Sequence, residues 1–217
     1  NTSSDQLITS SKALKELKLA ENALSKNEIN LAFKHALLAS NLAPNLLEVK
    51  LMLADIQLKK GYVEDAIRLL KETYEKSPTS LKLVFKLIDA YIEAYQFKNA
   101  TNLINIASNI PGGKLHDFYG AKAKLALFRG DRSAAIGWYQ RAANSNPVDD
   151  SNIFALAKLF VEAYRFLDAK AVLLKAMDLD PSKIEYKLLY ARILYEVETS
   201  RAAIGYLYNV LEDFPDN

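Results

Sequence analysis

The 217-residue sequence predicts an all-α fold, an α-solenoid of six repeated helical hairpins, on three observations. Its six prolines recur every 33 to 36 residues, at Pro44, Pro78, Pro111, Pro147, Pro181 and Pro215. An alanine stands eleven or twelve residues before each proline, at Ala32, Ala66, Ala100, Ala135, Ala169 and Ala203. With 50% hydrophobic residues and only 7 Gly, the chain can bury a core but is too poor in turn formers for a turn-rich β fold. A period near 34 residues accommodates two helices and their turns, which is typical of solenoids.

Within each period, two apolar stripes with helical spacing predict two antiparallel helices, so twelve helices are expected in all. In the second period the first stripe contains Leu51 and Leu58, and the second contains Ala66 and Leu70. The repeats are expected at 13–46, 47–80, 81–114, 116–149, 150–183 and 184–217, after a polar linker and the start of the first helix in 1–12. The second helices are expected to begin near Glu28, Val63, Phe97, Asp131, Phe166 and Ser200.

The expected ends of these helices carry residues suited to turns. Proline closes the second helix because it cannot continue a helix and restricts the residue before it. Asn27, Gly61 and Gly130 stand between the two helices of three hairpins, where they tolerate the left-handed conformation of a helix C-terminus. The period gains one residue at Pro111-Gly112-Gly113, where a longer loop is preferred to a hinge.

These spacings resemble the tetratricopeptide repeat, whose 34-residue unit has a small residue at position 8, Ala at 20, a small residue at 27 and Pro at 32. Position 8 is occupied by Ala20, Ala54, Ile88, Ala123, Ala157 and Ala191, so only the third repeat departs from a small residue. The resemblance covers 13–217. It implies a right-handed superhelix whose first helices line a concave groove, and a function in protein–protein interaction.

Composition and motifs disfavour several other functions. The 28 Lys and Arg residues nearly balance the 26 Asp and Glu residues, which gives a net charge of +2. This charge is lower than the strongly positive charge expected of a nucleic-acid-binding domain. No apolar run approaches the about 18 residues of a membrane span, so direct membrane insertion is not expected. The chain has no Cys, only two His, and no phosphate-binding loop. We therefore expect no catalytic residue, metal or cofactor, and no enzyme activity.

The resemblance places the candidate partner-binding residues on the first helices. Position 5 contributes Leu17, Leu51, Phe85, Gly120, Phe154 and Leu188, and position 12 contributes Leu24, Leu58, Ile92, Leu127, Val161 and Tyr195. A contiguous apolar strip of this kind would suit an amphipathic helix or an extended apolar peptide. The alternative is that neighbouring helices cover these side chains.

Position 9 is charged in every repeat, with the acidic residues first and the basic residues last. These residues are Glu21, Asp55, Asp89, Lys124, Lys158 and Arg192. They add a charge gradient to the candidate groove, although ordinary solvated charge is the alternative. Leu17 and Glu21 stand where chaperone-binding arrays carry Lys and Asn, so a chaperone-adaptor function is not expected.

Two further features predict contact sites. Gly120, between the aromatic residues Phe85 and Phe154 of the position-5 row, is expected to leave a pocket in the middle of the groove. The alternative is that it relieves crowding beside Tyr119 or near the extra residue after Pro111. The last helix carries apolar residues and no polar closing helix follows it in the sequence, so a further helix of the full-length protein, or a crystal or oligomer contact, is expected to cover that face. These residues are Tyr206, Leu207, Val210, Leu211 and Phe214. The two ends are expected to be those of a processed chain or of a segment of a longer protein.

The function expected from these features is that of a non-catalytic scaffold, which binds a partner peptide or helix in its groove. A bacterial multiprotein assembly is the favoured setting, in the envelope, a pilus, secretion or polysaccharide export. Two alternatives stay open: a regulatory or substrate-recruiting arm of a larger enzyme or signalling protein, and a self-associating coat. The compartment is left open between bacterial cytoplasm and periplasm.

Overall fold

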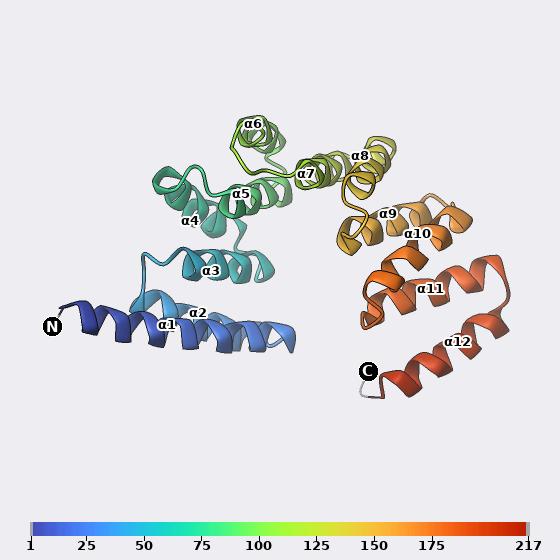
Figure 1. Cartoon of the computed structure of the whole chain (residues 1–217), viewed down its shortest axis with the longest axis horizontal. Coiled ribbons are helices and arrows are strands. Elements are labelled where there is room, and N and C mark those ends of the chain that lie inside the picture. Colours follow the sequence, from blue (N-terminus) through green and yellow to red (C-terminus); the bar gives the residue numbers. More distant parts are fainter. Residues whose placement is uncertain (1, 216–217) are drawn as a thin grey trace. The chain divides into compact units, whose positions relative to one another are not determined.

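A computed structural model describes the backbone of residues 2–215 and the side chains of residues 9–215 (Figure 1). This part of the chain forms twelve α-helices and no strand, which confirms the predicted all-α fold. The helices are α1 (Thr2–Ser25), α2 (Ile29–Leu42), α3 (Leu47–Lys59), α4 (Val63–Lys76), α5 (Leu81–Glu93), α6 (Phe97–Ala107), α7 (Leu115–Phe128), α8 (Arg132–Ser145), α9 (Asp150–Glu162), α10 (Phe166–Leu179), α11 (Ile184–Val197) and α12 (Ser200–Asp213). Each second helix begins within one residue of the position expected from the sequence.

The helices form two compact units, residues 2–111 and 112–215, with three hairpins in each. In the first unit α1 packs on α2, α3 on α4 and α5 on α6, and α3 also contacts α1 and α5. In the second unit the pairs are α7 with α8, α9 with α10 and α11 with α12, and α9 also contacts α11. Within a unit, each hairpin therefore packs only on its neighbours in the chain, as expected of stacked repeats.

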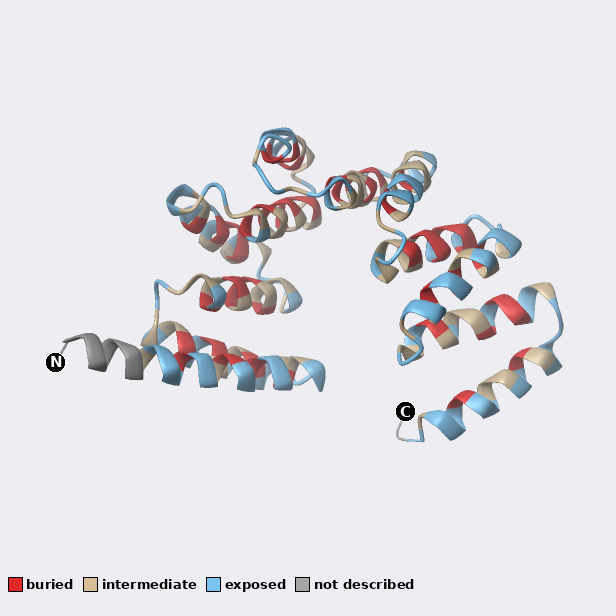
Figure 2. Ribbon diagram, in the orientation of Figure 1, coloured by how far each residue is buried: buried red, intermediate tan, exposed pale blue. Residues whose placement is uncertain are grey.

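The repeated small residues lie at the crossings of the helices. Ala32, Ala66, Ala100, Ala135 and Ala169 are fully buried, and Ala203 is 5% exposed. Because these side chains are small, the two helices of each hairpin approach closely. In second helices such as α2 and α4 the buried residues follow one face, whereas first helices such as α5 are buried over a wider arc. Figure 2 colours the buried residues red. The alanines that the spacing placed between the two helices of each hairpin are therefore the residues that are buried there.

The turns inside the hairpins adopt the left-handed conformation in five of the six repeats. Tyr95 and Tyr164 do so at φ 58°, although neither was expected to. In both turns a backbone bond closes the helix end, such as Arg165 N donating to Phe160 O at 2.8 Å. Each tyrosine ring also packs edge-on against a phenylalanine two residues later, with centroids 5.8 and 6.0 Å apart. The other left-handed turn residues are Asn27, Gly61 and Gly130.

Helix α1 begins at Thr2, so the start of the first helix, which was expected within residues 1–12, lies at the second residue. Once the packed part of a helix has formed, each further residue adds a hydrogen bond without a new nucleation cost. Asn1 of the expected linker, and residues 216–217 of the sixth expected repeat, lie outside the described residues. No described helix combines the length and the apolar character that a membrane span needs.

Two glycines of the 112–215 unit should respond to alanine in opposite ways. Gly137 lies inside α8, and a methyl group added there would meet open space, so Gly137→Ala should stabilise the chain by about 1 kcal/mol. Gly130 also has open space, but its φ of +83° strains any larger residue, so Gly130→Ala should destabilise it by about 1 kcal/mol. Urea unfolding of both variants measures these changes. A loss of stability in Gly137→Ala would contradict the helical register of α8.

Candidate functional site

The position-5 row of the expected groove is partly covered by the next first helix, most completely in the first two repeats. In the first unit Leu17 and Leu51 are 7% and 3% exposed, and Leu17 shares a core cluster with Val49 of the next first helix. In the second unit the ring of Phe154 lies against that of Tyr186, with centroids 4.4 Å apart. Position 5 of one repeat thus packs near position 3 of the next.

The position-12 row follows the same pattern. Ile92 and Val161 are buried, whereas Leu24, Leu58 and Leu127 are half-buried, as is Phe85 of the position-5 row. The exposed members of the two rows are Leu188 and Tyr195 on α11, at 50% and 59% exposure. Of the twelve residues in the two rows, four are buried, six are half-buried and two are exposed, so the expected apolar strip is only partly open to solvent.

Gly120 does not leave a pocket on the side that faces α9. A methyl group at Gly120 would stand 2.9 Å from Oδ1 of Asn152, so the asparagine side chain occupies the space next to the glycine. Asn152 is held there because its Nδ2 donates to Oδ2 of Asp149 at 2.9 Å. Gly120 thus relieves crowding between α7 and α9, where its neighbour is Asn152 rather than Tyr119 or the loop after Pro111.

The charged position-9 residues differ in their surroundings. In the first unit, Glu21 is exposed and the half-buried Asp55 accepts hydrogen bonds from Lys86 of the next first helix. In the second unit, the Lys158 ammonium lies 4.9 Å from the centre of the Phe154 ring, and Arg192 is exposed. Asp89 and Lys124 are half-buried. The acidic members lie in the first unit and the basic members in the second.

A polar network ties α9 to α11. Tyr186 OH and Lys183 Nζ donate to Asp150 Oδ2 at 2.8 and 2.7 Å, and Lys183 Nζ also donates to Tyr186 OH at 3.0 Å. The hydrogen bond from Lys183 lowers the pKa of Asp150 below its ordinary value, and the bond from Tyr186 adds to this effect. Burial raises the pKa of Tyr186, whose side chain is 1% exposed. The network is therefore a structural link between repeats.

The stability of the 112–215 unit should depend on the charge of Asp150. Because the folded pKa of Asp150 lies below its ordinary value of 3.8, the stabilisation is present above about pH 4 and is lost as the pH falls through the folded pKa. We expect Asp150→Asn to weaken the acid dependence of the urea midpoint between about pH 5 and pH 2.5. Asp178→Asn, an exposed carboxylate on α10, is the control. Equal acid dependence in the Asp150→Asn variant and the unaltered chain would contradict this role.

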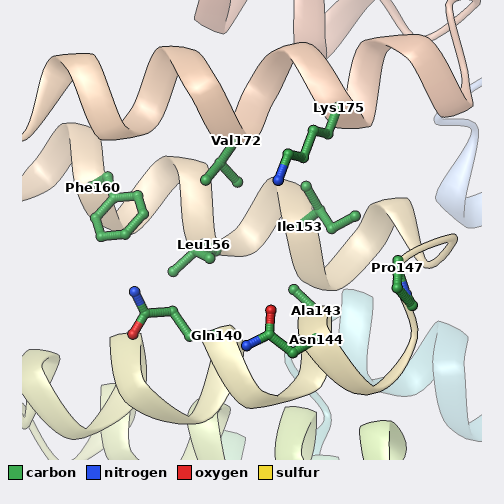
Figure 3. Close-up of a pocket in the computed structure, with 9 residues that line it drawn as sticks. All are labelled: Gln140, Ala143, Asn144, Pro147, Ile153, Leu156, Phe160, Val172 and Lys175. Carbon is green, nitrogen blue, oxygen red and sulfur yellow. The ribbon is translucent and has the colours of Figure 1, made fainter.

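A cleft of about 600 Å³ opens between α8 and α10, and α9 forms its floor (Figure 3). Ile153, Leu156 and Phe160 of α9 are each 3% exposed and make this floor apolar. The rim carries polar groups from the two flanking helices, namely the Gln140 and Asn144 amides of α8 and the Lys175 ammonium of α10. An apolar floor with a few polar groups at its rim is typical of a site for a small ligand or an anchoring side chain.

Sequence reasoning missed this cleft because its walls come from the second helices of two different repeats. Its rim residues Gln140, Asn144 and Lys175 follow no shared motif.

The described residues contain no group of three His, Cys, Asp or Glu side chains that could hold a metal ion. Of the two histidines, His35 lies 2.6 Å from Glu16 through its Nδ1. His116 lies 3.4 Å from both Asp117 and Asn146 through its Nε2. Each histidine is thus engaged with one or two side chains of the same unit.

Comparison with known proteins identifies the fold. No protein-family model and no curated protein sequence matches the chain. Among solved structures, it is similar to TTC0263, a tetratricopeptide repeat protein of Thermus thermophilus, with a TM-score of 0.73 and 21% identity over 84% of this chain and 99% of that chain. It is similar to PilW, a type IV pilus biogenesis factor, with a TM-score of 0.66 and 15% identity over 94% of both chains.

A third similar structure is YrrB, a tetratricopeptide repeat protein with an unusual peptide-binding site. Its TM-score is 0.52 and its identity 14%, over 82% of this chain and 92% of that chain. Together with the twelve observed helices, these similarities confirm the predicted resemblance at the level of the fold. The chain is a tetratricopeptide-type α-solenoid of six helical hairpins.

Proposed function

We propose that the chain is a non-catalytic scaffold that binds a segment of a partner protein. The tetratricopeptide-type fold supports this function, since stacked helical hairpins offer long surfaces for peptides and helices. YrrB, which shares the fold, has a peptide-binding site. We further propose a bacterial multiprotein assembly as the setting, since TTC0263 comes from a bacterium and PilW is a pilus biogenesis factor.

The observation that carries the proposal is the cleft between α8 and α10. Its volume of about 600 Å³ accommodates one or two apolar side chains of a bound segment. The floor is already formed by buried side chains, so binding requires little rearrangement of the repeat. Lys175 at the rim offers an ammonium group to a carboxylate, and the Gln140 and Asn144 amides can pair with a peptide backbone. The preferred ligand is therefore an apolar anchor with an acidic group beside it.

The first-helix row is a second candidate surface for the same function. Within it, Lys158 and Arg192 are the exposed basic members of the 112–215 unit, and Leu188 and Tyr195 are the exposed apolar members. An acidic segment with apolar side chains suits this surface too. The two surfaces come from different helices, so substitutions can distinguish them.

Peptides selected from a random library on the intact chain test the proposal. If the cleft is the site, Lys175→Glu should lower the affinity of the chain for the selected peptides about tenfold, which corresponds to about 1.4 kcal/mol. Lys71→Glu, an exposed lysine on α4, should leave their affinity unchanged. A tenfold loss with Lys158→Glu or Arg192→Glu, and none with Lys175→Glu, would assign binding to the first-helix row. Failure to select any peptide would argue against the scaffold function.

A further inference from the structure

The outer surface of the last hairpin carries an uncovered apolar face. We define the terminal face by its exposed residues Leu188, Tyr195, Ile204, Tyr208 and Leu211, which are 50% to 67% exposed. Between α11 and α12 it is hollowed by about 390 Å³, and the hollow is lined mainly by Leu, Ile, Ala and Tyr side chains, with Arg192 and Ser200 beside them. A surface of this kind in a folded chain marks a contact site.

The preceding hairpin shows what such a face does when it is covered. Phe154, Val161 and Leu173 of α9 and α10 occupy the repeat positions that Leu188, Tyr195 and Leu207 occupy in the last hairpin. All three lie in or against the core cluster that Tyr186 of α11 completes. The part of the last hairpin at Leu188, Tyr195 and Leu207 therefore corresponds to a helix-binding surface inside the repeat array, but none of the described helices covers it. Tyr208 corresponds to Leu174, which is 40% exposed in the covered hairpin.

The spacing of residues along α12 indicates the kind of helix that fits. Ile204, Leu207 and Leu211 follow one another at intervals of three and four residues, which is the a/d pattern of a two-helix seam. Arg201 stands at one end of this seam and Glu212 at the other. At 100° per residue the two lie about 20° apart around the helix axis, on the same flank. Neither has an ion-pair partner among the described residues, and both are exposed.

This arrangement is complementary to itself when a copy runs in the opposite direction. In an antiparallel helix pair, the same flank of both helices meets, so Arg201 of each copy would face Glu212 of the other. The positive N-terminal end of each helix would also lie beside the negative C-terminal end of its partner. A two-fold contact would therefore bury the apolar seam and pair both charged residues at once.

A head-to-tail contact between copies is much less favourable. In such a stack α1 would take the place that α11 takes on α9. Lys15 and Asn22 of α1 then stand at the repeat positions of Tyr186 and Ile193, and both are exposed polar residues. Placing them on the terminal face would bury a charge and an amide without partners.

We propose that the chain forms a two-fold dimer through the terminal face, with the α12 helices of two copies packed antiparallel. The occupant of the face is thus a second copy of this chain. The inference does not depend on peptide binding in the cleft between α8 and α10, which lies on other helices. The first-helix row, in contrast, shares Leu188 and Tyr195 with the terminal face.

Sedimentation velocity of the intact chain between about 1 and 200 µM tests the dimer. We expect a reversible monomer–dimer equilibrium in this range, and its loss in the Ile204→Glu variant, since a dimer would bury two unpaired carboxylates. Ile106→Glu is the matched control, since Ile106 on α6 and Ile204 are both isoleucines with 54% exposure. A chain that stays monomeric at all concentrations, or a dimer unaffected by Ile204→Glu, would overturn the proposal.

A charge exchange tests the antiparallel arrangement. Arg201→Glu and Glu212→Arg should each weaken the dimer about tenfold at low salt, because each places like charges together at both ends of the seam. The double variant restores opposite charges and should recover the original dissociation constant. Circular dichroism checks that each variant keeps its helices. Two weakened single variants without recovery in the double variant would overturn the antiparallel pairing.

Discussion

Tyr186→Ala is expected to lower the free energy of unfolding of the 112–215 unit by about 3–5 kcal/mol. The tyrosine side chain is 1% exposed and belongs to the core cluster that joins α9, α10 and α11. Its ring packs on Phe154, and its hydroxyl donates to Asp150. Alanine would leave a large cavity between two repeats and would remove one partner of a polar network.

Tyr186→Phe separates these two contributions. It keeps the ring in the core and removes only the hydroxyl, while the ion pair of Lys183 with Asp150 remains, so a smaller loss of about 1–2 kcal/mol is expected. Urea unfolding, followed by circular dichroism, measures both variants. If Tyr186→Ala cost no more than Tyr186→Phe, the ring would not contribute to the packing of α11 on α9.

Gly120→Leu is expected to destabilise the chain by about 1–3 kcal/mol through overpacking. Replacing a glycine in the middle of a helix by a larger residue ordinarily stabilises the chain. Here the first added carbon meets the Asn152 side chain at 2.9 Å, and a hydrogen bond to Asp149 holds that side chain in place. The crowding should therefore outweigh the gain in helix propensity.

Asn152→Ala provides the test of this explanation. Truncating the asparagine opens space beside Gly120, so Gly120→Leu should cost less in the Asn152→Ala background, and the two changes should couple by about 1 kcal/mol or more. The four chains of this cycle are compared by urea unfolding. Additive effects would show that Asn152 is not the side chain that restricts residue 120.

The hairpins and their register could be predicted from the sequence because local steric rules determine them. Ala66 and Ala169 mark the close crossings, and prolines such as Pro147 mark the ends of second helices, at nearly constant spacing. The left-handed turns at Tyr95 and Tyr164 were missed. There the backbone bonds of the helix end impose a conformation that tyrosine alone does not favour.

The exposure of the first-helix row could not be predicted from single positions. Whether a residue at position 5 is open depends on the size of its neighbour in the next repeat. Tyr186 covers Phe154, and Asn152 fills the space at Gly120. Residues of opposite charge about one repeat apart in the sequence could have indicated which first helices pack on each other. Asp150 and Lys183, 33 residues apart, are one such pair.

The local nature of the contacts has a consequence for how the chain folds. Within each unit, every helix packs only on helices one or two places away in chain order. The loops that must close are therefore short, and closing them costs little entropy. A unit built in this way has a low contact order, so its folding should be fast and can begin at any hairpin. Once one hairpin has formed, its neighbours can add to it in either direction.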